Sequence, residues 1–132
     1  RTVRVQFDAD TSRALPWYFE PEQRSIEVHL GERGITAYTA RNKKNEPTAG
    51  TAIYNVTPAK AGKYFHKIQC FCFDEQILAA KQKVSMPVLF FVDPAMDEDP
   101  NMEDVKTITL SYTFFPANSK ALDDALEAFY NE

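Results

Sequence analysis

Apolar and polar side chains alternate along several short stretches of this chain, and this alternation restricts its fold more than any other feature. In the clearest stretch, residues 107–114, threonines and a serine alternate with four apolar residues: Ile108, Leu110, Tyr112 and Phe114. Successive side chains of a β-strand point to opposite faces, so a period of two predicts a strand with one buried face. The same period recurs over residues 3–7 and 26–30. The chain is therefore expected to consist mainly of strands.

Glycines and prolines divide the rest of the chain into further extended segments. We expect these strands at about residues 35–41, 51–56, 63–73, 77–84 and, after Pro87, 88–92. The segment Leu15–Pro21 contains two prolines and the only tryptophan, Trp17. Because proline cannot donate to a central ladder, this segment is expected at an edge, with Trp17 over one end of the core. Seven or eight short strands separated by turns predict an all-β fold, an immunoglobulin-like β-sandwich.

The C-terminal residues follow a helical period instead. Apolar residues recur there at i, i+3, i+4 and i+7: Leu122, Ala125, Leu126 and Phe129. Ser119 is the expected N-cap, and Asp123 and Asp124 suit the positive end of a helix. Such a short helix is marginal alone, so it is expected to pack on the domain or bind a partner. We thus predict one domain over residues 1–117 and a helical tail over residues 118–132.

Charge and hydropathy limit the kinds of partner. The 132 residues carry a net charge of −4, and the basic residues are scattered apart from a predicted turn at residues 41–44. Nucleic acid is therefore not an expected partner, since phosphate binding needs clustered cations. The longest apolar run, Met86–Val92, is far shorter than the roughly 20 residues that span a bilayer. Because the chain begins at Arg1 without an initiator methionine, we expect that a preceding segment was removed or left out.

Cys70 and Cys72 are the only cysteines, and they stand one residue apart. A disulfide between them would distort an extended strand. On a strand both sulfurs project from one face, while Phe71 and Phe73 anchor the other. Two soft thiolates suit Cu(I), whereas zinc requires four ligands, which two histidines and no further cysteine do not readily supply. Two alternatives stay open: buried cysteines acting as small hydrophobic residues, and thiol redox chemistry, although that chemistry usually has the C-x-x-C spacing.

Two other side chains are candidates for the same site. The thioether of Met86 can assist Cu(I), although a methionine beside an apolar strand is more commonly core filler. His66 has the same parity as Cys70 and would approach it on a regular strand, although a surface or core imidazole is the more common role. No phosphate loop or catalytic motif is present, which indicates a binding protein and not an enzyme.

The loop over residues 93–104 is rich in acidic residues and proline. It lacks the glycine and the twelfth-position glutamate of an EF-hand, so it is expected to be a solvated loop and not a calcium site. Met96 and Met102 lie in this loop and are expected to be exposed.

The cysteine segment also resembles a known family. Gly62–Phe73, with its Cys-Phe-Cys-Phe run, is similar to the signature of the CtaG family of cytochrome c oxidase assembly proteins. The resemblance covers roughly residues 1–117 and continues through further segments: Leu15–Trp17, Gly50–Val56, Asp74–Gln76, Met86–Val88, Phe90–Pro94 and Thr109–Phe115.

The resemblance implies a membrane-tethered copper chaperone, in which Cys70 and Cys72 bind Cu(I). Family members carry an N-terminal transmembrane helix, absent from this chain, and an immunoglobulin-like sandwich on the periplasmic side of the bacterial inner membrane. In mitochondria the sandwich faces the intermembrane space. It receives copper from a donor protein and delivers it to the Cu-B centre of cytochrome c oxidase subunit I. Copper-bridged homodimers are characteristic, and a further cysteine near the membrane helix is missing here.

Two functions compete with copper delivery. One is a thiol-disulfide oxidoreductase that keeps the copper ligands of an oxidase assembly partner reduced. The other is a plain interaction module whose cysteines belong to the core. Two thiolates per chain would hold copper incompletely, so we also expect copper loading to promote dimerisation.

Overall fold

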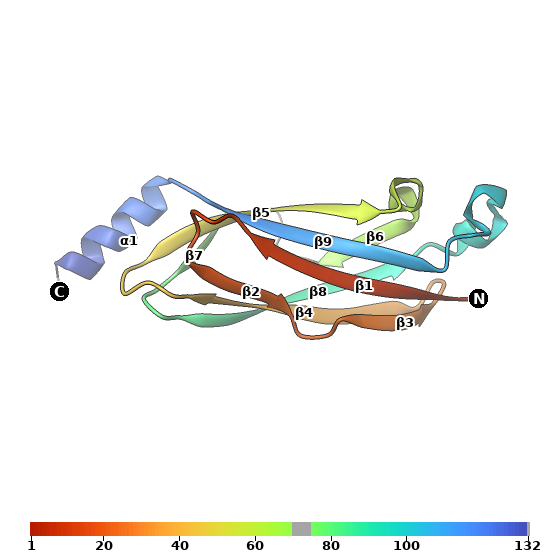
Figure 1. Cartoon of the computed structure of the whole chain (residues 1–132), viewed down its shortest axis with the longest axis horizontal. Helices are drawn as coiled ribbons and strands as arrows, with labels where there is room; N and C mark the ends of the chain where they lie inside the picture. The colour runs from red at the N-terminus through yellow and green to blue at the C-terminus, as the bar shows by residue number, and fades with distance from the viewer. Residues whose placement is uncertain (70–74, 132) are drawn as a thin grey trace.

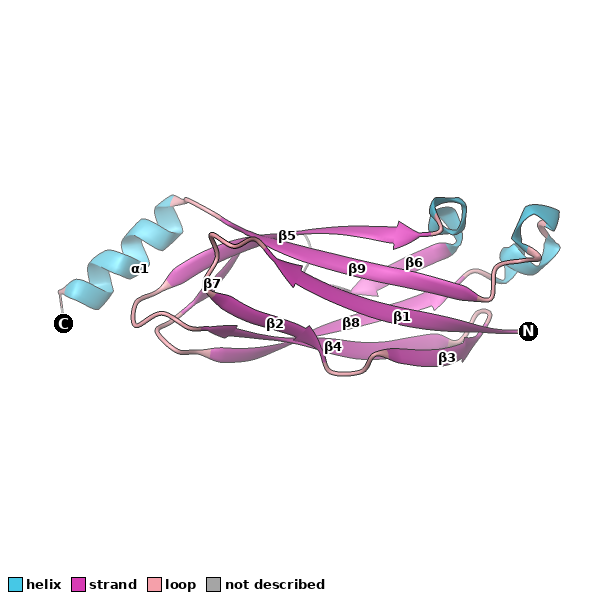
Figure 2. Ribbon diagram, in the orientation of Figure 1, coloured by secondary structure: helices cyan, strands magenta, loops and turns pink. Residues whose placement is uncertain are grey.

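The computed structural model is an elongated sandwich of two β-sheets with a helix at one end (Figure 1). It describes residues 1–69 and 75–131. The predicted all-β sandwich with a short C-terminal helix is confirmed, with nine strands in the described residues instead of seven or eight. Figure 2 shows the α-helix at one end of the sheets and the short 3-10 turns at the opposite end.

One sheet has five strands and the other four. The five-stranded sheet has the order β3 (Ser25–His29), β1 (Thr2–Thr11), β9 (Thr107–Pro116), β5 (Thr48–Thr57) and β7 (Gln76–Leu78). The four-stranded sheet has the order β2 (Trp17–Pro21), β4 (Arg33–Asn42), β8 (Lys83–Val92) and β6 (Phe65–Gln69). The pair β1 and β9 is parallel, and the other pairs are antiparallel.

The core lies between the sheets and follows the predicted alternation. In β9 the four apolar residues of the alternating pattern are all 0% exposed. Tyr38 crosses the core and its hydroxyl donates to the Leu110 carbonyl over 3.2 Å. Burial raises the pKa of both Tyr38 and Tyr112 far above the ordinary value for tyrosine. Trp17 is buried at one end, as predicted, where its indole nitrogen donates to Thr48 over 2.6 Å.

The strand boundaries differ from the prediction at three places. β8 continues through Pro87, which pairs with Ala37 of β4, so no break occurs there. The expected strand over residues 77–84 is interrupted by a turn in which Lys81 has a φ of 61°. Residues 63–64 belong to the 3-10 turn η1 (Ala59–Tyr64) instead of a strand.

The acidic loop is more ordered than predicted. It forms two 3-10 turns, η2 (Pro94–Glu98) and η3 (Pro100–Met102), whose N-caps are Asp93 and Asp99. These turns direct two methionine side chains into the end of the sandwich, where Met96 is 0% and Met102 1% exposed. The expectation that both are exposed was therefore wrong, because local capping turned the chain back onto the core.

Helix α1 (Lys120–Tyr130) begins where the sequence predicts. The Ser119 hydroxyl accepts a hydrogen bond from the Leu122 amide over 3.1 Å, as an N-cap does. Ser119 also donates to Glu75 over 2.6 Å, and Tyr130 at the other end of the helix donates to Glu46. No helix in the described residues is long and apolar enough to cross a membrane.

Candidate metal centre

Cys70 and Cys72 lie outside the described residues, so the structure describes the strands on either side of them. β6 ends at Gln69 and is the edge strand of the four-stranded sheet, while β7 begins at Gln76 and is the edge strand of the five-stranded sheet. Lys67 of β6 lies over the ring of Tyr54 of β5, so these two sheet edges face each other. In the sequence, the cysteine segment therefore stands between an edge strand of one sheet and an edge strand of the other.

Aromatic packing attaches β6 to the core just before the cysteine segment. Phe65 is buried and stacks on Phe90 of β8, with ring centroids 5.1 Å apart and an interplanar angle of 22°. Farther along, the pairing of β6 with β8 shifts register between Lys67 and Gln69, as a β-bulge or a similar irregularity does. The strand that precedes the cysteine segment is thus anchored at its start and irregular at its end.

The register shift removes the argument that placed His66 near the cysteines. The shared parity of His66 and Cys70 assumed a regular strand, and the pairing of β6 with β8 is not regular between Lys67 and Gln69. His66 instead lies 3.1 Å from the Asp93 carboxylate and tilts against the Phe91 ring at 4.9 Å. The amide of Ala95 and, secondarily, His66 lower the pKa of Asp93 below its ordinary value.

Met86 occupies the core and not a surface near the cysteine segment. It is 3% exposed and pairs across β4 with Tyr38. This placement agrees with the core-filler interpretation of Met86. Within residues 1–69 and 75–131, no cluster of three or more metal-binding side chains is arranged to hold an ion.

Two charged residues that flank the cysteine segment in the sequence, Lys67 and Glu75, were not among the predicted site residues. Lys67 is half-buried between the sheet edges, and burial lowers its pKa to about 8. Glu75 follows the cysteine segment directly and accepts a hydrogen bond from Ser119, which ties α1 to this edge. Neither contact can be predicted from the neighbouring sequence, because each is made with a residue that is distant in the chain.

The burial of Lys67 predicts a pH dependence of stability. Its native pKa of about 8 lies below the ordinary 10.5, so between these values the unfolded chain holds a proton that the native chain has released. The free energy of unfolding therefore rises with pH over that interval. Urea denaturation gives the free energy of unfolding of wild type and of Lys67→Met. We expect the wild-type value to rise relative to that of Lys67→Met from pH 7.5 to 9.5. Parallel curves for the two proteins would contradict this, and Lys106→Met, an exposed lysine, is the control.

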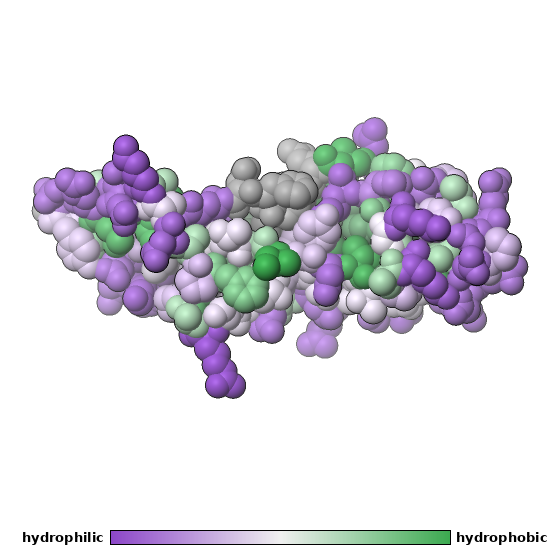
Figure 3. All heavy atoms as spheres, turned by 90° about the horizontal axis from the view of Figure 1, so that it is seen from above, coloured by the Kyte–Doolittle hydropathy of each residue, from purple (hydrophilic) through white to green (hydrophobic). Residues whose placement is uncertain are grey.

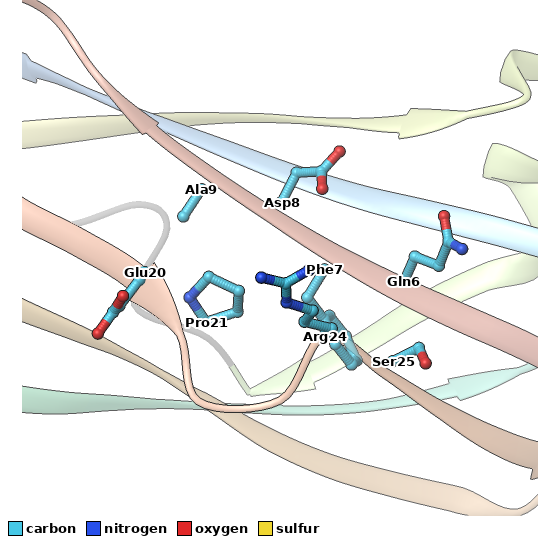
Figure 4. Close-up of a pocket in the computed structure, with 8 residues that line it drawn as sticks. All are labelled: Gln6, Phe7, Asp8, Ala9, Glu20, Pro21, Arg24 and Ser25. Carbon is cyan, nitrogen blue, oxygen red and sulfur yellow. The ribbon is translucent and has the colours of Figure 1, made fainter.

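One pocket lies at the other edge of the sandwich. It has a volume of about 480 Å³ and lies between β1 and β2, with Asp8, Glu20 and Arg24 as its charged side chains (Figure 4). Seen from above, the molecular surface is mostly hydrophilic, with apolar residues in small, separate groups (Figure 3). No residue of β6 or β7 lines this pocket.

The relatives of the chain identify the family. Residues 1–116 match the family model described as cytochrome c oxidase assembly protein CtaG/Cox11. The chain belongs to this family. The match contains both cysteines and ends before α1, and it confirms the resemblance found in the sequence.

Curated relatives named cytochrome c oxidase assembly protein CtaG support the same assignment. The protein from Cereibacter sphaeroides is 54% identical over 114 residues, which cover 86% of this chain and 60% of the relative. That from Brucella anthropi is 51% identical over 116 residues, covering 88% and 57%. That from Ruegeria sp. is 51% identical over 127 residues, covering 93% and 65%. The chain therefore spans about three fifths of the length of the CtaG proteins that it matches.

Proposed function

We propose that this chain is the copper-binding domain of a membrane-tethered chaperone that carries Cu(I) on Cys70 and Cys72 and delivers it to the Cu-B centre of cytochrome c oxidase subunit I. The observation that carries this proposal is the family match over residues 1–116, which contains the only two cysteines of the chain. The relatives are named as oxidase assembly proteins, and two thiolates are ligands that Cu(I) favours. A membrane anchor preceding Arg1 and a periplasmic position belong to the same proposal.

The strand arrangement supports metal transfer more than metal storage. The strands that precede and follow the cysteine segment in the sequence are both edge strands, which an acceptor protein can approach without crossing the core. A pair of thiolates leaves the coordination of copper incomplete, so an incoming ligand can displace one sulfur at a time. Two chains that pool four thiolates would hold copper more tightly until an acceptor arrives.

A competitive Cu(I) titration against a chromophoric chelator, without oxygen, tests the proposal. We expect wild type to withdraw copper from the chelator and Cys70→Ser/Cys72→Ser to lose that affinity by orders of magnitude, because serine hydroxyls are poor ligands for a soft ion. His66→Ala and Met86→Leu are matched controls that should retain it. Size exclusion in 500 mM NaCl should show copper-loaded wild type as a dimer.

Other outcomes separate the alternatives. A reversible disulfide between the two cysteines with little copper affinity would favour the thiol oxidoreductase. Neither copper binding nor reversible oxidation would leave a plain interaction module. A wild type that stays monomeric at saturating copper would contradict the shared site.

A further inference from the structure

The outer face of the four-stranded sheet carries a row of apolar side chains where an antiparallel sheet usually presents polar ones. Odd-numbered residues of β4 and β8 point outward, since the even-numbered residues between them are mostly buried. Among the outward residues, Ile35 pairs with Leu89, Ala37 pairs with Pro87, and Phe91 follows on β8. Ile35 is 66% exposed, and the other four are exposed or half-buried. We call these five residues the apolar strip.

Basic side chains border the apolar strip at both ends. Arg33 begins β4, and Arg41 and Lys83 are directly opposite each other farther along β4 and β8. The Lys43 ammonium lies 4.6 Å from the centre of the Tyr18 ring, which belongs to the same face and is 60% exposed. No ion pair within residues 1–69 and 75–131 involves any of these four cations.

Two carboxylates share the face with these cations. Glu20 is exposed on β2, and Glu22 accepts a hydrogen bond from the Ser85 hydroxyl over 2.6 Å. The basic groups therefore outnumber the acidic ones by two, and the outer face of this sheet is positively charged.

The outer face of the five-stranded sheet has the opposite charge. On β1, Arg4 forms an ion pair with Glu27 over 3.6 Å, while Asp8 and Asp10 are exposed. Its exposed isoleucine, Ile53, pairs with a threonine and stands among hydroxyl-bearing side chains instead of an apolar row. The two faces thus differ in charge and in apolar content, although the chain as a whole carries −4.

An apolar centre with cations at both ends and an exposed tyrosine is the composition of a surface that lies on an anionic bilayer. Apolar side chains enter the boundary between headgroups and acyl chains, tyrosine favours the headgroup level, and lysine and arginine contact lipid phosphates. The strands run along the long axis of the sandwich, so the face can lie along a plane over their whole length (Figure 1). A bilayer offers negative charge to both ends of the strip at once.

We propose that the outer face of the four-stranded sheet binds the surface of a bilayer that contains anionic phospholipid. The apolar strip enters the headgroup region, and Arg33, Arg41, Lys43 and Lys83 contact the phosphates. This binding needs neither copper nor a membrane anchor, so it goes beyond the proposed function. In an anchored protein it would lay the sandwich flat and hold β6, an edge strand of the same sheet, at the membrane surface.

Sedimentation with vesicles of phosphatidylcholine and phosphatidylglycerol tests this on the metal-free chain. We expect half of the protein to bind at on the order of 1 mM lipid in 20 mM NaCl, and much less in 500 mM NaCl or on pure phosphatidylcholine. Cys70→Ser/Cys72→Ser should bind equally well, so a failure here leaves the copper proposal intact. Protein that stays in the supernatant with anionic vesicles at low salt would overturn the inference, even if an acidic protein bound the same face.

Charge reversal tests the basic border. Each basic residue near an anionic surface strengthens binding about fivefold, so Arg41→Glu/Lys83→Glu should weaken it at least tenfold in 100 mM NaCl. Lys106→Glu/Lys120→Glu is the matched control, because it changes the net charge equally at exposed positions outside the four-stranded sheet. The control should lose less than threefold, since charges beyond about 10 Å are screened at this salt concentration. Equal losses for the two variants would overturn the inference.

A pair of isoleucines tests the apolar strip and the orientation. Ile35→Ser should weaken binding about fivefold, whereas Ile53→Ser, at a position of similar exposure on the other face, should leave it unchanged. Nitroxide-labelled lipid should broaden the amide signals of β4 and β8 more than those of β1 and β9 in nuclear magnetic resonance spectra. Broadening confined to β1 and β9, or equal effects of the two serine variants, would overturn the inference.

Discussion

Replacing Phe90 with alanine is expected to lower the free energy of unfolding by about 3–5 kcal/mol. Phe90 is 0% exposed on β8 and contacts rings from both sheets, Phe65 at 5.1 Å and Phe7 at 5.9 Å. A Cβ atom added to Gly34 would come within 2.6 Å of its ring, so the backbone of β4 lies directly on Phe90. Truncation leaves a cavity between well-packed strands that cannot close without moving the backbone.

Urea denaturation measures the effect, and Ile35→Ala is the matched control. Ile35 is on the neighbouring strand and 66% exposed, so its truncation should change stability by less than about 0.5 kcal/mol. Because Phe90 supports Phe65, amide hydrogen exchange in β6 should accelerate more than in β1. A loss below about 1 kcal/mol for Phe90→Ala would contradict the packing described here.

The second large effect is expected for Asn42→Ala, at about 2–4 kcal/mol of unfolding free energy. Asn42 is 0% exposed, and its side-chain amide donates to the carbonyls of Glu46, Leu78 and Ala79 over 2.9, 3.2 and 3.1 Å. Its oxygen accepts from the Lys44 amide over 3.0 Å. Alanine removes all four hydrogen bonds from positions that water does not readily reach, although the Ala79 carbonyl still accepts from the Gln82 amide over 3.0 Å.

Thermal denaturation compares this variant with Asn45→Ala, an exposed asparagine of the same turn that should be neutral. Asn42→Asp should also destabilise, because it removes the donors and places a carboxylate in a buried site. Equal melting temperatures for Asn42→Ala and Asn45→Ala would disprove the bridging role.

Elements that depend on neighbouring residues were predictable. The alternation in β9 and the Ser119 cap both follow from the chain's local geometry, and both occur where the sequence places them. The family resemblance was also readable, because it rests on residue identities and not on contacts. The pairing of Cys70 with Cys72 as copper ligands stays a prediction, since both lie outside the described residues.

Features that depend on distant residues were not predictable. Pro87 falls within a strand because β4 pairs with it, and the register shift between Lys67 and Gln69 depends on how β6 pairs with β8. Met96 was expected at the surface, yet the turn that begins at Asp93 buries it. In each case the backbone pairing or packing of a remote segment outweighed the local preference.

The sequence by itself determined the class of the fold, the position of the helix and the family, because periodicity, capping and residue identities are properties of short segments. Only the tertiary structure decided that β6 and β7 are edge strands of different sheets and that Lys67 is half-buried. It alone placed Lys83 opposite Arg41. These outcomes depend on strand order and register, which bring together residues that the chain keeps far apart.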